Sequence, residues 1–316
     1  MISLDRILES HKKISPYINH TPLVHSDYLS KNRTVKLKLE SLQKTGSFKL
    51  RGATNKLLAL SDEQKNRGVI AVSTGNHGKG VAYASSLLGI KSTIYMSTMV
   101  PQYRKEAIEA LGANVEIYGA NSDEADLHAR EISKKENIPL IHPFDDEDVI
   151  AGQGTVGLEM LKDFPEVDTV IIPTSGGGLI GGIALALKLQ KPDIKVIAVS
   201  MERGPSMYES LKKGKPVDVE ELETLADCLG GSIGLENKFT FDIVKNSVDD
   251  FVLISEEKIA EGIRLNFTEH RLVTEGAAAT SVMVAKDNLS SHLGKNVICL
   301  ICGGNIDYKL FSEIIA

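Results

Sequence analysis

Short runs of apolar, β-branched residues alternate with longer amphipathic runs along almost the whole chain. This alternation is typical of a mostly parallel sheet flanked by helices, so the predicted fold class is α/β. The predicted strands are Val35–Leu39, Gly68–Ser73, Ser92–Met96, Val115–Tyr118, Thr169–Pro173, Lys195–Ser200, Phe251–Ile254 and Asn296–Ile301. The predicted helices are Leu4–Lys13, Leu50–Leu60, Gly78–Leu88, Gln102–Leu111, Ser122–Lys134, Leu179–Leu189, Glu256–Thr268 and Gly276–Lys286.

The order of these elements suggests two domains. The stretch from about 66 to 142 has the pattern of a compact βαβαβ unit, which follows one helix and precedes a second set of strands. We therefore predict a small α/β domain over residues 61–142, inserted into a larger domain made of residues 1–60 and 143–316. This boundary rests on element order, because no change in composition marks it.

Composition narrows the class of protein. Hydrophobic residues make up 42% and charged residues 25% of the 316 residues, as in ordinary globular proteins. The net charge of −6 argues against a nucleic-acid surface or a polybasic membrane anchor. No apolar run approaches the roughly 20 residues that span a bilayer, and the N-terminus does not resemble a signal peptide. Three cysteines cannot form a disulfide framework, so a cytoplasmic location is expected.

One lysine stands out as a candidate for covalent chemistry. Residues 45–53 read Thr-Gly-Ser-Phe-Lys-Leu-Arg-Gly-Ala, with Lys49 at the centre. A lysine amine becomes nucleophilic and can form a Schiff base where a partly desolvated pocket lowers its pKa. The chain has 36 Lys and Arg residues, so Lys49 gains its significance only from the glycine-bearing turns that follow it.

The turn Thr174-Ser175-Gly176-Gly177-Gly178 connects a predicted strand to a predicted helix. Successive glycines let backbone N–H groups approach an anion, and the helix N-terminus adds the positive end of a dipole, so the turn is a candidate phosphate site. It could instead only connect the two elements. Gly176, Gly178 and Gly181 also match the dinucleotide-binding fingerprint, with Glu202 near the place of a ribose-binding acid. A nicotinamide-dependent dehydrogenase is thus a rival hypothesis, although it would leave Lys49 without a role.

Two further turns complete the set. Ser73-Thr74-Gly75-Asn76-His77-Gly78 joins another strand to a helix, and its N–H groups suit a carboxylate. The Asn76 amide could donate to a phenolate-like oxygen, whereas His77 alone is better explained as a structural residue than as a catalytic one. Cys302-Gly303-Gly304-Asn305 ends the last strand, where the thiol could face a ring nitrogen or be a simple buried cysteine. The histidines show no ligand spacing, so no metal site is expected.

Taken together, Ser47–Ala53, Ser73–Gly78, Ser175–Leu179 and Cys302–Asn305 resemble the pyridoxal-phosphate enzymes of the tryptophan-synthase-β type, or fold type II. Within this group the chain is most similar to the threonine/serine dehydratase and serine racemase family, from about Ile14 to its C-terminus. The resemblance implies a two-domain fold and pyridoxal 5′-phosphate as cofactor. It implies a small amino acid as substrate and a homodimer as assembly.

The resemblance also implies a role for each motif. Lys49 would hold the cofactor as a Schiff base and, once freed, act as general base. Phe48 would back the ring, Asn76 would bond the ring hydroxyl oxygen and Cys302 would meet the pyridine nitrogen. The phosphate would be bound by Ser175, Gly176, Gly177, Gly178 and Leu179, and the substrate carboxylate by Ser73, Thr74, Gly75, Asn76 and His77. A neutral partner for the ring nitrogen favours β-elimination of water over other outcomes, giving a 2-oxo acid and ammonia.

Several positions depart from the family pattern. Cys302 stands where serine is usual, and Thr74 stands where racemases present a serine acid–base, so racemisation stays open. Ser200 and Ser206 appear at the positions of the carboxylates that bind a divalent metal in racemase-like members, and a serine cannot replace a carboxylate there. Segments 200–204 and 225–234 resemble dehydratases associated with hydroxyectoine utilisation. The chain ends at Ala316, so no C-terminal regulatory domain is expected. A non-catalytic binding module is the remaining alternative, which the presence of Lys49 disfavours.

Overall fold

Two sheets organise the molecule, which is described here from a computed structural model covering residues 2–316, apart from the side chains of residues 122 and 123. A six-stranded sheet has the order β1-β2-β9-β6-β7-β8, and a three-stranded sheet has the order β3-β4-β5. Every neighbouring pair is parallel except β1 and β2. The larger sheet consists of β1 (Leu23–His25), β2 (Thr34–Leu39), β6 (Thr169–Pro173), β7 (Lys195–Met201), β8 (Asp250–Ile254) and β9 (Asn296–Ile301); the smaller one consists of β3 (Val69–Val72), β4 (Ser92–Met96) and β5 (Asn114–Ile117).

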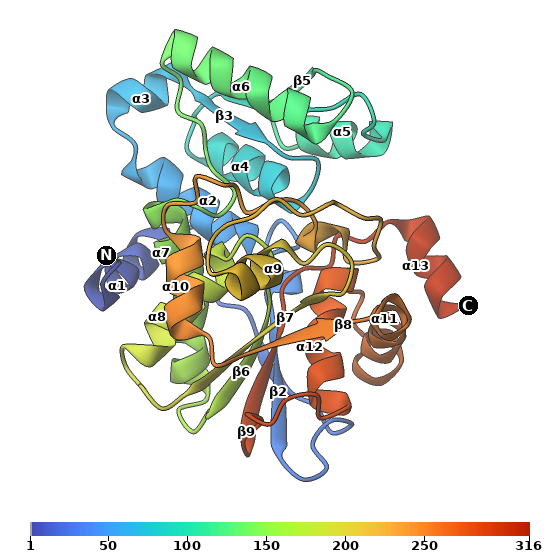
Figure 1. Ribbon diagram of the computed structural model, residues 1–316. Helices are drawn as coiled ribbons and strands as arrows, with labels where there is room; N and C mark the ends of the chain where they lie inside the picture. Colours follow the sequence, from blue (N-terminus) through green and yellow to red (C-terminus); the bar gives the residue numbers. More distant parts are fainter. Residues whose placement is uncertain (1) are drawn as a thin grey trace.

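Helices surround both sheets, and each sheet with its helices forms one lobe of the molecule (Figure 1). The upper lobe in Figure 1 holds the small sheet with α3, α4, α5 and α6, and the lower lobe holds the large sheet with the remaining helices. The helices are α1 (Leu4–Ile14), α2 (Lys49–Ala59), α3 (Asp62–Arg67), α4 (Asn76–Leu87), α5 (Gln102–Glu109), α6 (Ser122–Glu136), α7 (Glu147–Asp163), α8 (Gly178–Lys188), α9 (Ser206–Lys213), α10 (Thr240–Ser247), α11 (Glu256–His270), α12 (Gly276–Lys286) and α13 (Tyr308–Ile315), with 3₁₀ turns at Glu40–Leu42 and Asp227–Leu229.

The predicted α/β class is confirmed, and each predicted strand is present with ends that differ by at most a residue or two. The prediction was incomplete: strand β1 and helices α3, α7, α9, α10 and α13 were not among the predicted elements. Strand β1 was missed because three residues at a sheet edge carry too short a pattern to recognise. Helix α7 was missed because Gly152, Gly154 and Gly157 interrupt its sequence, and glycine is a poor helix former. The predicted domain boundaries at residues 61–142 stay a prediction.

The glycines of α7 have a packing reason. A Cβ atom on Gly152 would lie 2.7 Å from the Cα atom of Gly52 in α2, and one on Gly154 would lie 2.9 Å from the carbonyl oxygen of Gly182 in α8. Both distances are shorter than any real side chain tolerates, so only glycine lets these backbones meet. Helix α7 therefore fixes the helix that begins with Lys49 and the helix that begins with Gly178 relative to each other.

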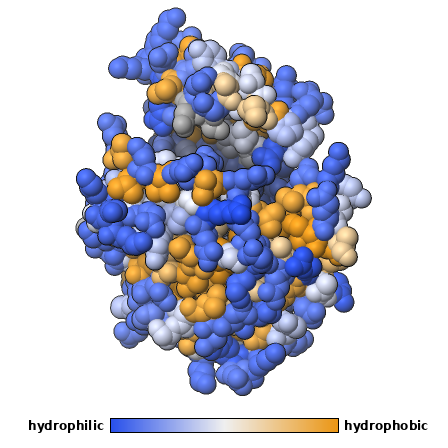
Figure 2. Space-filling view, turned by 45° about the vertical axis from the view of Figure 1, so that its right-hand side comes forward, coloured by the Kyte–Doolittle hydropathy of each residue, from blue (hydrophilic) through white to orange (hydrophobic). Residues whose placement is uncertain are grey.

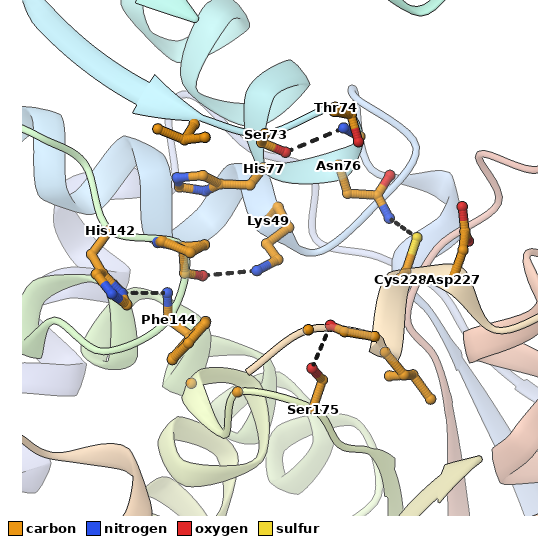
Figure 3. Close-up of a pocket in the computed structure, with 18 of the residues that line it drawn as sticks. Lys49, Ser73, Thr74, Asn76, His77, His142, Phe144, Ser175, Asp227 and Cys228 are labelled. Carbon is orange, nitrogen blue, oxygen red and sulfur yellow. Dashed lines mark hydrogen bonds between the residues drawn. The ribbon is translucent and has the colours of Figure 1, made fainter. Parts of the chain in front are cut away.

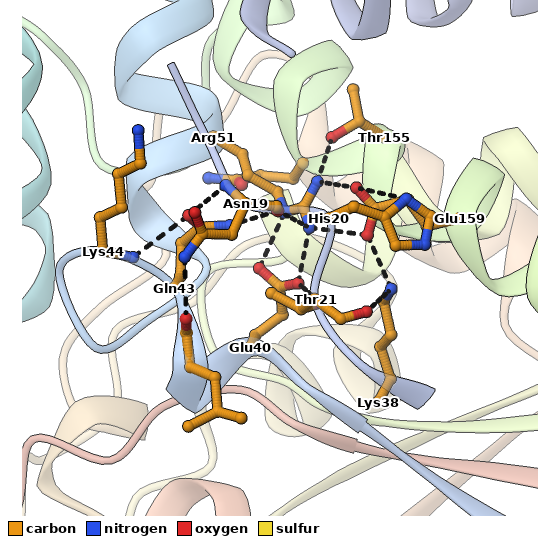
Figure 4. Close-up of polar contacts among 12 residues, drawn as sticks. Asn19, His20, Thr21, Lys38, Glu40, Gln43, Lys44, Arg51, Thr155 and Glu159 are labelled. Carbon is orange, nitrogen blue, oxygen red and sulfur yellow. Dashed lines mark hydrogen bonds and ion pairs between the residues drawn. The ribbon is translucent and has the colours of Figure 1, made fainter. Parts of the chain in front are cut away.

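A buried network of charges also connects α2 with α7 (Figure 4). The Arg51 guanidinium donates to both oxygens of Glu40 at 2.8 Å and to Glu159 of α7 at 2.7 Å and 2.9 Å. Lys38 of β2 donates to the same Glu159 carboxylate at 2.6 Å. All four side chains are at most 1% exposed, and burial opposes the charge of Arg51, but Glu40 and Glu159 raise its pKa above the ordinary value. The network connects α2 to the large sheet and to α7. Its central residue, Arg51, is two positions after Lys49 in α2.

Candidate active site

A pocket of about 490 Å³ opens between the two lobes. In the space-filling view the surface is hollowed at this place, between the upper and lower halves of the molecule (Figure 2). Every residue that the sequence singled out for the site lines this one pocket: Phe48, Lys49, Ser73, Thr74, Gly75, Asn76, His77, Ser175, Gly176, Gly177, Gly178, Leu179 and Cys302. They come from four separate segments of the chain, which the parallel topology brings together where strands end and helices begin.

Lys49 is the first residue of α2, and its side chain points into the pocket (Figure 3). Its Nζ atom donates to the main-chain oxygen of Pro143 at 2.8 Å and lies 5.4 Å from the centre of the Phe48 ring. Burial lowers the pKa of Lys49 to about 8, against the opposing effects of Cys228, Cys302 and Glu275. A larger fraction of the Lys49 amine is therefore neutral near physiological pH than for an ordinary lysine, as Schiff-base formation requires.

The Ser175–Leu179 turn follows β6 and opens α8 at its N-terminus. Gly177 adopts φ +87°, which a residue with a side chain rarely does, and the ring of Phe144 packs against Gly176. Within residues 2–316 no acceptor meets the backbone N–H groups of Ser175, Gly176 or Gly177. Free N–H groups beside a helix N-terminus form an anion site, so the turn fits a cofactor phosphate.

The Ser73–His77 turn leads from β3 into α4. The Oγ atom of Ser73 accepts from the N–H of Gly75 at 3.2 Å, which shapes the turn. The His77 ring pairs with the carbonyl of Ile141 at 2.8 Å, and burial with the nearby Lys49 charge lowers the pKa of His77 to about 3. The His77 ring is therefore neutral and donates to a carbonyl oxygen, which favours a structural role over acid–base catalysis.

Cys302 directly follows β9, and its thiol is buried in the pocket wall. Burial and the neighbouring Glu275 raise the pKa of Cys302 well above its ordinary value. The thiol stays protonated, as the neutral partner of a ring nitrogen would. Cys228 also lines the pocket, and its thiol lies 3.5 Å from Nδ2 of Asn76.

The structure adds pocket residues that the motifs did not reveal. His142, Pro143 and Phe144 border both Lys49 and the glycine turn, and the loop 227–234 closes another side. Glu275 is the most unexpected of them, because a carboxyl group lies buried at the start of α12. Its sequence neighbourhood, Val-Thr-Glu-Gly-Ala, reads only as an ordinary helix start. Arg104 of α5 pairs with Asp227 at 3.2 Å across the mouth of the pocket.

The serines at the compared metal positions have other partners. Ser200 Oγ lies 3.2 Å from the Sδ atom of Met201, and Ser206 Oγ donates to the carbonyl of Gly231 at 2.8 Å. Among the described residues no cluster of three or more His, Cys, Asp or Glu could hold a metal ion. Across the same part of the chain, no helix combines the length and the apolar character needed to cross a lipid bilayer.

Several known proteins are similar to this chain in sequence and in fold. A family model described as "Pyridoxal-phosphate dependent enzyme" matches residues 14–303. A putative threonine dehydratase of Sinorhizobium fredii is 42% identical over 99% of this chain and 95% of its own length. The catabolic L-threonine dehydratase TdcB of Staphylococcus aureus is 43% identical over 100% of this chain and 92% of its own length.

Among solved structures, maize serine racemase is 32% identical and superimposes with a TM-score of 0.93, covering 98% of this chain and 96% of its own. The predicted resemblance, the fold type II architecture and the cofactor class are thereby confirmed. Lys49 within the pocket and the unpaired N–H groups of the glycine turn are what such a cofactor needs. The chain belongs to the family of pyridoxal-phosphate-dependent enzymes.

Proposed function

We propose that this protein is an ammonia-lyase that removes water from a small β-hydroxy amino acid, such as L-threonine or L-serine, and yields a 2-oxo acid and ammonia. The observation that carries the proposal is the position of Lys49, which lines one pocket together with the phosphate-type glycine turn and the protonated thiol of Cys302. Two relatives that match over nearly their whole length are named threonine dehydratases. Bound pyridoxal phosphate would supply an electron sink that makes the α-hydrogen of the amino acid acidic.

Lys49 would hold the cofactor and later take the α-proton at Nζ. A general base works best when its pKa is near the working pH, and the pKa of Lys49 is lowered to about 8. The hydrogen bond to Pro143 and the adjacent Phe48 ring keep the amine inside the pocket. The same lysine therefore serves both steps.

The Ser73–His77 turn would bind the substrate carboxylate. Its residues stand at the N-terminus of α4, where backbone N–H groups and the helix dipole favour an anion. His77 is neutral and turned to Ile141, so the carboxylate would meet main-chain donors rather than an imidazolium.

Cys302 would face the pyridine nitrogen as an uncharged partner. A neutral partner does not stabilise a protonated ring nitrogen, so charge left by the departing α-proton is best removed by expelling the β-hydroxyl group. Elimination of water is then favoured over reactions in which the negative charge persists after the α-proton has left. The preference for a dehydratase follows from the thiol staying protonated.

The test is a lysine substitution. Lys49→Ala should abolish absorbance near about 410–420 nm, which reports the lysine–cofactor bond, and reduce turnover by orders of magnitude. Lys91→Ala removes an exposed lysine and is the matched control. Near-normal release of 2-oxo acid by the Lys49 variant would end the proposal.

A second candidate is amino-acid racemisation. Thr74 lines the pocket beside the substrate turn, and no hydrogen bond to another described residue occupies its hydroxyl group. A hydroxyl group on the face opposite Lys49 could return a proton to the α-carbon. Analysis of product chirality separates this activity from elimination.

The substrate could also be larger than threonine. The segment 225–234, which resembles the hydroxyectoine-associated dehydratases, contributes Asp227–Gly234 to the pocket lining. We infer that a β-hydroxy amino acid from hydroxyectoine breakdown is the substrate to assay after threonine and serine. The resemblance also supports a cytoplasmic homodimer, which light scattering and cell fractionation would test.

A further inference from the structure

Glu275 is a buried carboxyl group with no cation beside it. It is 2% exposed and stands at the N-cap of α12, but its side chain makes no capping hydrogen bond. Within the described part of the chain, no lysine, arginine or histidine nitrogen lies within 4.0 Å of its oxygens. An unpaired buried charge is costly, so a purely structural explanation for this carboxyl group is weak.

Two residues that contact Glu275, Asn76 and Cys302, line the pocket. The Nδ2 atom of Asn76 donates to both carboxyl oxygens at 3.0 Å, and the main-chain N–H of Asn305 donates to Oε2 at 3.2 Å. The Cys302 thiol lies 3.9 Å from Oε1. Burial, reinforced by Asp227, raises the pKa of Glu275 to about 7, while the donors from Asn76 and Asn305 oppose that rise.

Asn76 is part of a chain of hydrogen bonds that begins at Lys79. The ammonium group of Lys79 donates to Oδ1 of Asn305 at 3.0 Å, and Nδ2 of Asn305 donates to Oδ1 of Asn76 at 2.6 Å. Nδ2 of Asn305 also donates to the carbonyl of Thr45 at 2.9 Å. The chain then continues from Nδ2 of Asn76 to Glu275.

The two ends of this chain determine its direction. An ammonium group only donates hydrogen bonds, whereas an amide can do either at each edge, and both carboxyl oxygens of Glu275 accept from Asn76. With Lys79 at one end and Glu275 at the other, both amides have a single consistent orientation. The Nδ2 atom of Asn76 then lies on the pocket side, 3.5 Å from the Cys228 thiol (Figure 3).

We propose that Glu275 is a positioning residue that, with Lys79 at the opposite end, keeps the N–H edge of the Asn76 amide toward the cofactor pocket. The inference rests on the proposed function, in which Asn76 bonds the ring hydroxyl oxygen of the cofactor. If the amide turned over, its carbonyl oxygen would face an anionic ring oxygen, and the two would repel. Glu275 thus acts on the cofactor through Asn76.

The substitution Glu275→Gln tests this step. Glutamine keeps the size of the side chain but can also donate hydrogen bonds, so the Asn76 amide loses one of the two groups that fix its orientation. We expect cofactor affinity to fall about tenfold, which corresponds to about 1.4 kcal/mol, together with a shifted visible absorbance band. Lys79→Met should act in the same direction but less, because the Thr45 carbonyl still orients Asn305. Glu257→Gln, an exposed change of the same charge in α11, is the control and should bind cofactor normally.

A double-mutant cycle with Asn76→Ala separates an indirect role from a direct or structural one. In the Asn76→Ala background, Glu275→Gln should cause no further loss of cofactor affinity, and the thermal midpoint of the cofactor-free protein should not fall. Wild-type affinity and spectrum in Glu275→Gln would overturn the inference, and so would an equal loss with and without Asn76. Such failures leave the Lys49→Ala result unchanged, so they are distinguishable from failure of the proposed function.

Discussion

The Nζ atom of Lys49 lies 2.8 Å from the main-chain oxygen of Pro143, although the two residues are 94 positions apart in the sequence. The next residue after Pro143 is Phe144, whose ring packs against Gly176 of the phosphate-type turn. One short segment therefore contacts both the nucleophilic amine and the anion site. This shared segment sets how the two halves of the cofactor site face each other.

The first prediction concerns the pH dependence of cofactor uptake. Only a neutral amine attacks the aldehyde carbon of pyridoxal phosphate, and burial lowers the pKa of Lys49 from 10.5 to about 8. The neutral fraction of the amine therefore rises as the pH rises through about 8. Stopped-flow mixing of cofactor-free protein with pyridoxal phosphate should show a rate that increases across this range and then levels. A rate that keeps increasing to about pH 10, as for an ordinary lysine, would contradict the assigned environment.

The second prediction concerns the glycine turn. Gly177→Ala forces a side chain onto a backbone with φ +87° and places a Cβ atom 2.8 Å from Cε of Met207. Gly214→Ala is a matched control, because Gly214 has φ +73° but open space around it. Each variant should lose about 1–2 kcal/mol of unfolding free energy from the backbone alone.

Cofactor affinity should distinguish these two glycine variants. Because only Gly177 belongs to the candidate phosphate site, Gly177→Ala should release pyridoxal phosphate at least about tenfold more readily. Gly214→Ala should retain it like the wild type. Equal retention by both variants, measured by equilibrium dialysis, would remove the turn from the cofactor site.

The third prediction concerns the buried charges behind Lys49. Glu159→Gln leaves Arg51 and Lys38 with an incomplete partner in a dry interior, so unfolding free energy should fall by about 3–5 kcal/mol. Glu9→Gln breaks an exposed pair with Lys13 at 3.4 Å and should cost less than about 1 kcal/mol. Urea unfolding of both variants measures the difference. A Glu159 variant as stable as the surface control would show that the network contributes little.

The fourth prediction concerns Thr74. If its hydroxyl group returns a proton to the α-carbon, Thr74→Ala should lose racemisation while 2-oxo acid formation changes little. Thr74→Ser keeps the hydroxyl group and should preserve both activities. Chiral chromatography of serine, run alongside 2-oxo acid detection, follows the two reactions together. Unchanged racemisation in Thr74→Ala would assign that proton to another donor.

Local patterns explain why so much of the site could be predicted from the sequence. Ser175–Leu179 and Ser73–His77 each combine a strand end, a glycine-bearing turn and a helix start, and the two turns line one pocket although their strands belong to different sheets. Helix α7 and the pocket residue Glu275 were not predicted, because both depend on contacts between distant parts of the sequence. Helix α7 depends on the approach of Gly152 to α2, and its own sequence does not favour a helix. Glu275 acquires its raised pKa from burial in the folded chain, and the hydrogen bonds that oppose the rise come from Asn76 and Asn305, which lie far from it in the sequence.

The most direct test of the central claim is the visible spectrum of the purified protein, followed in the same cuvette by addition of L-threonine with detection of 2-oxo acid. We predict absorbance near about 410–420 nm from the lysine-bound cofactor and steady release of 2-oxobutyrate. A coloured protein that releases no 2-oxo acid from threonine, serine or a hydroxyectoine-derived amino acid would contradict the proposed elimination. A colourless protein that takes up no pyridoxal phosphate would contradict the assignment of Lys49.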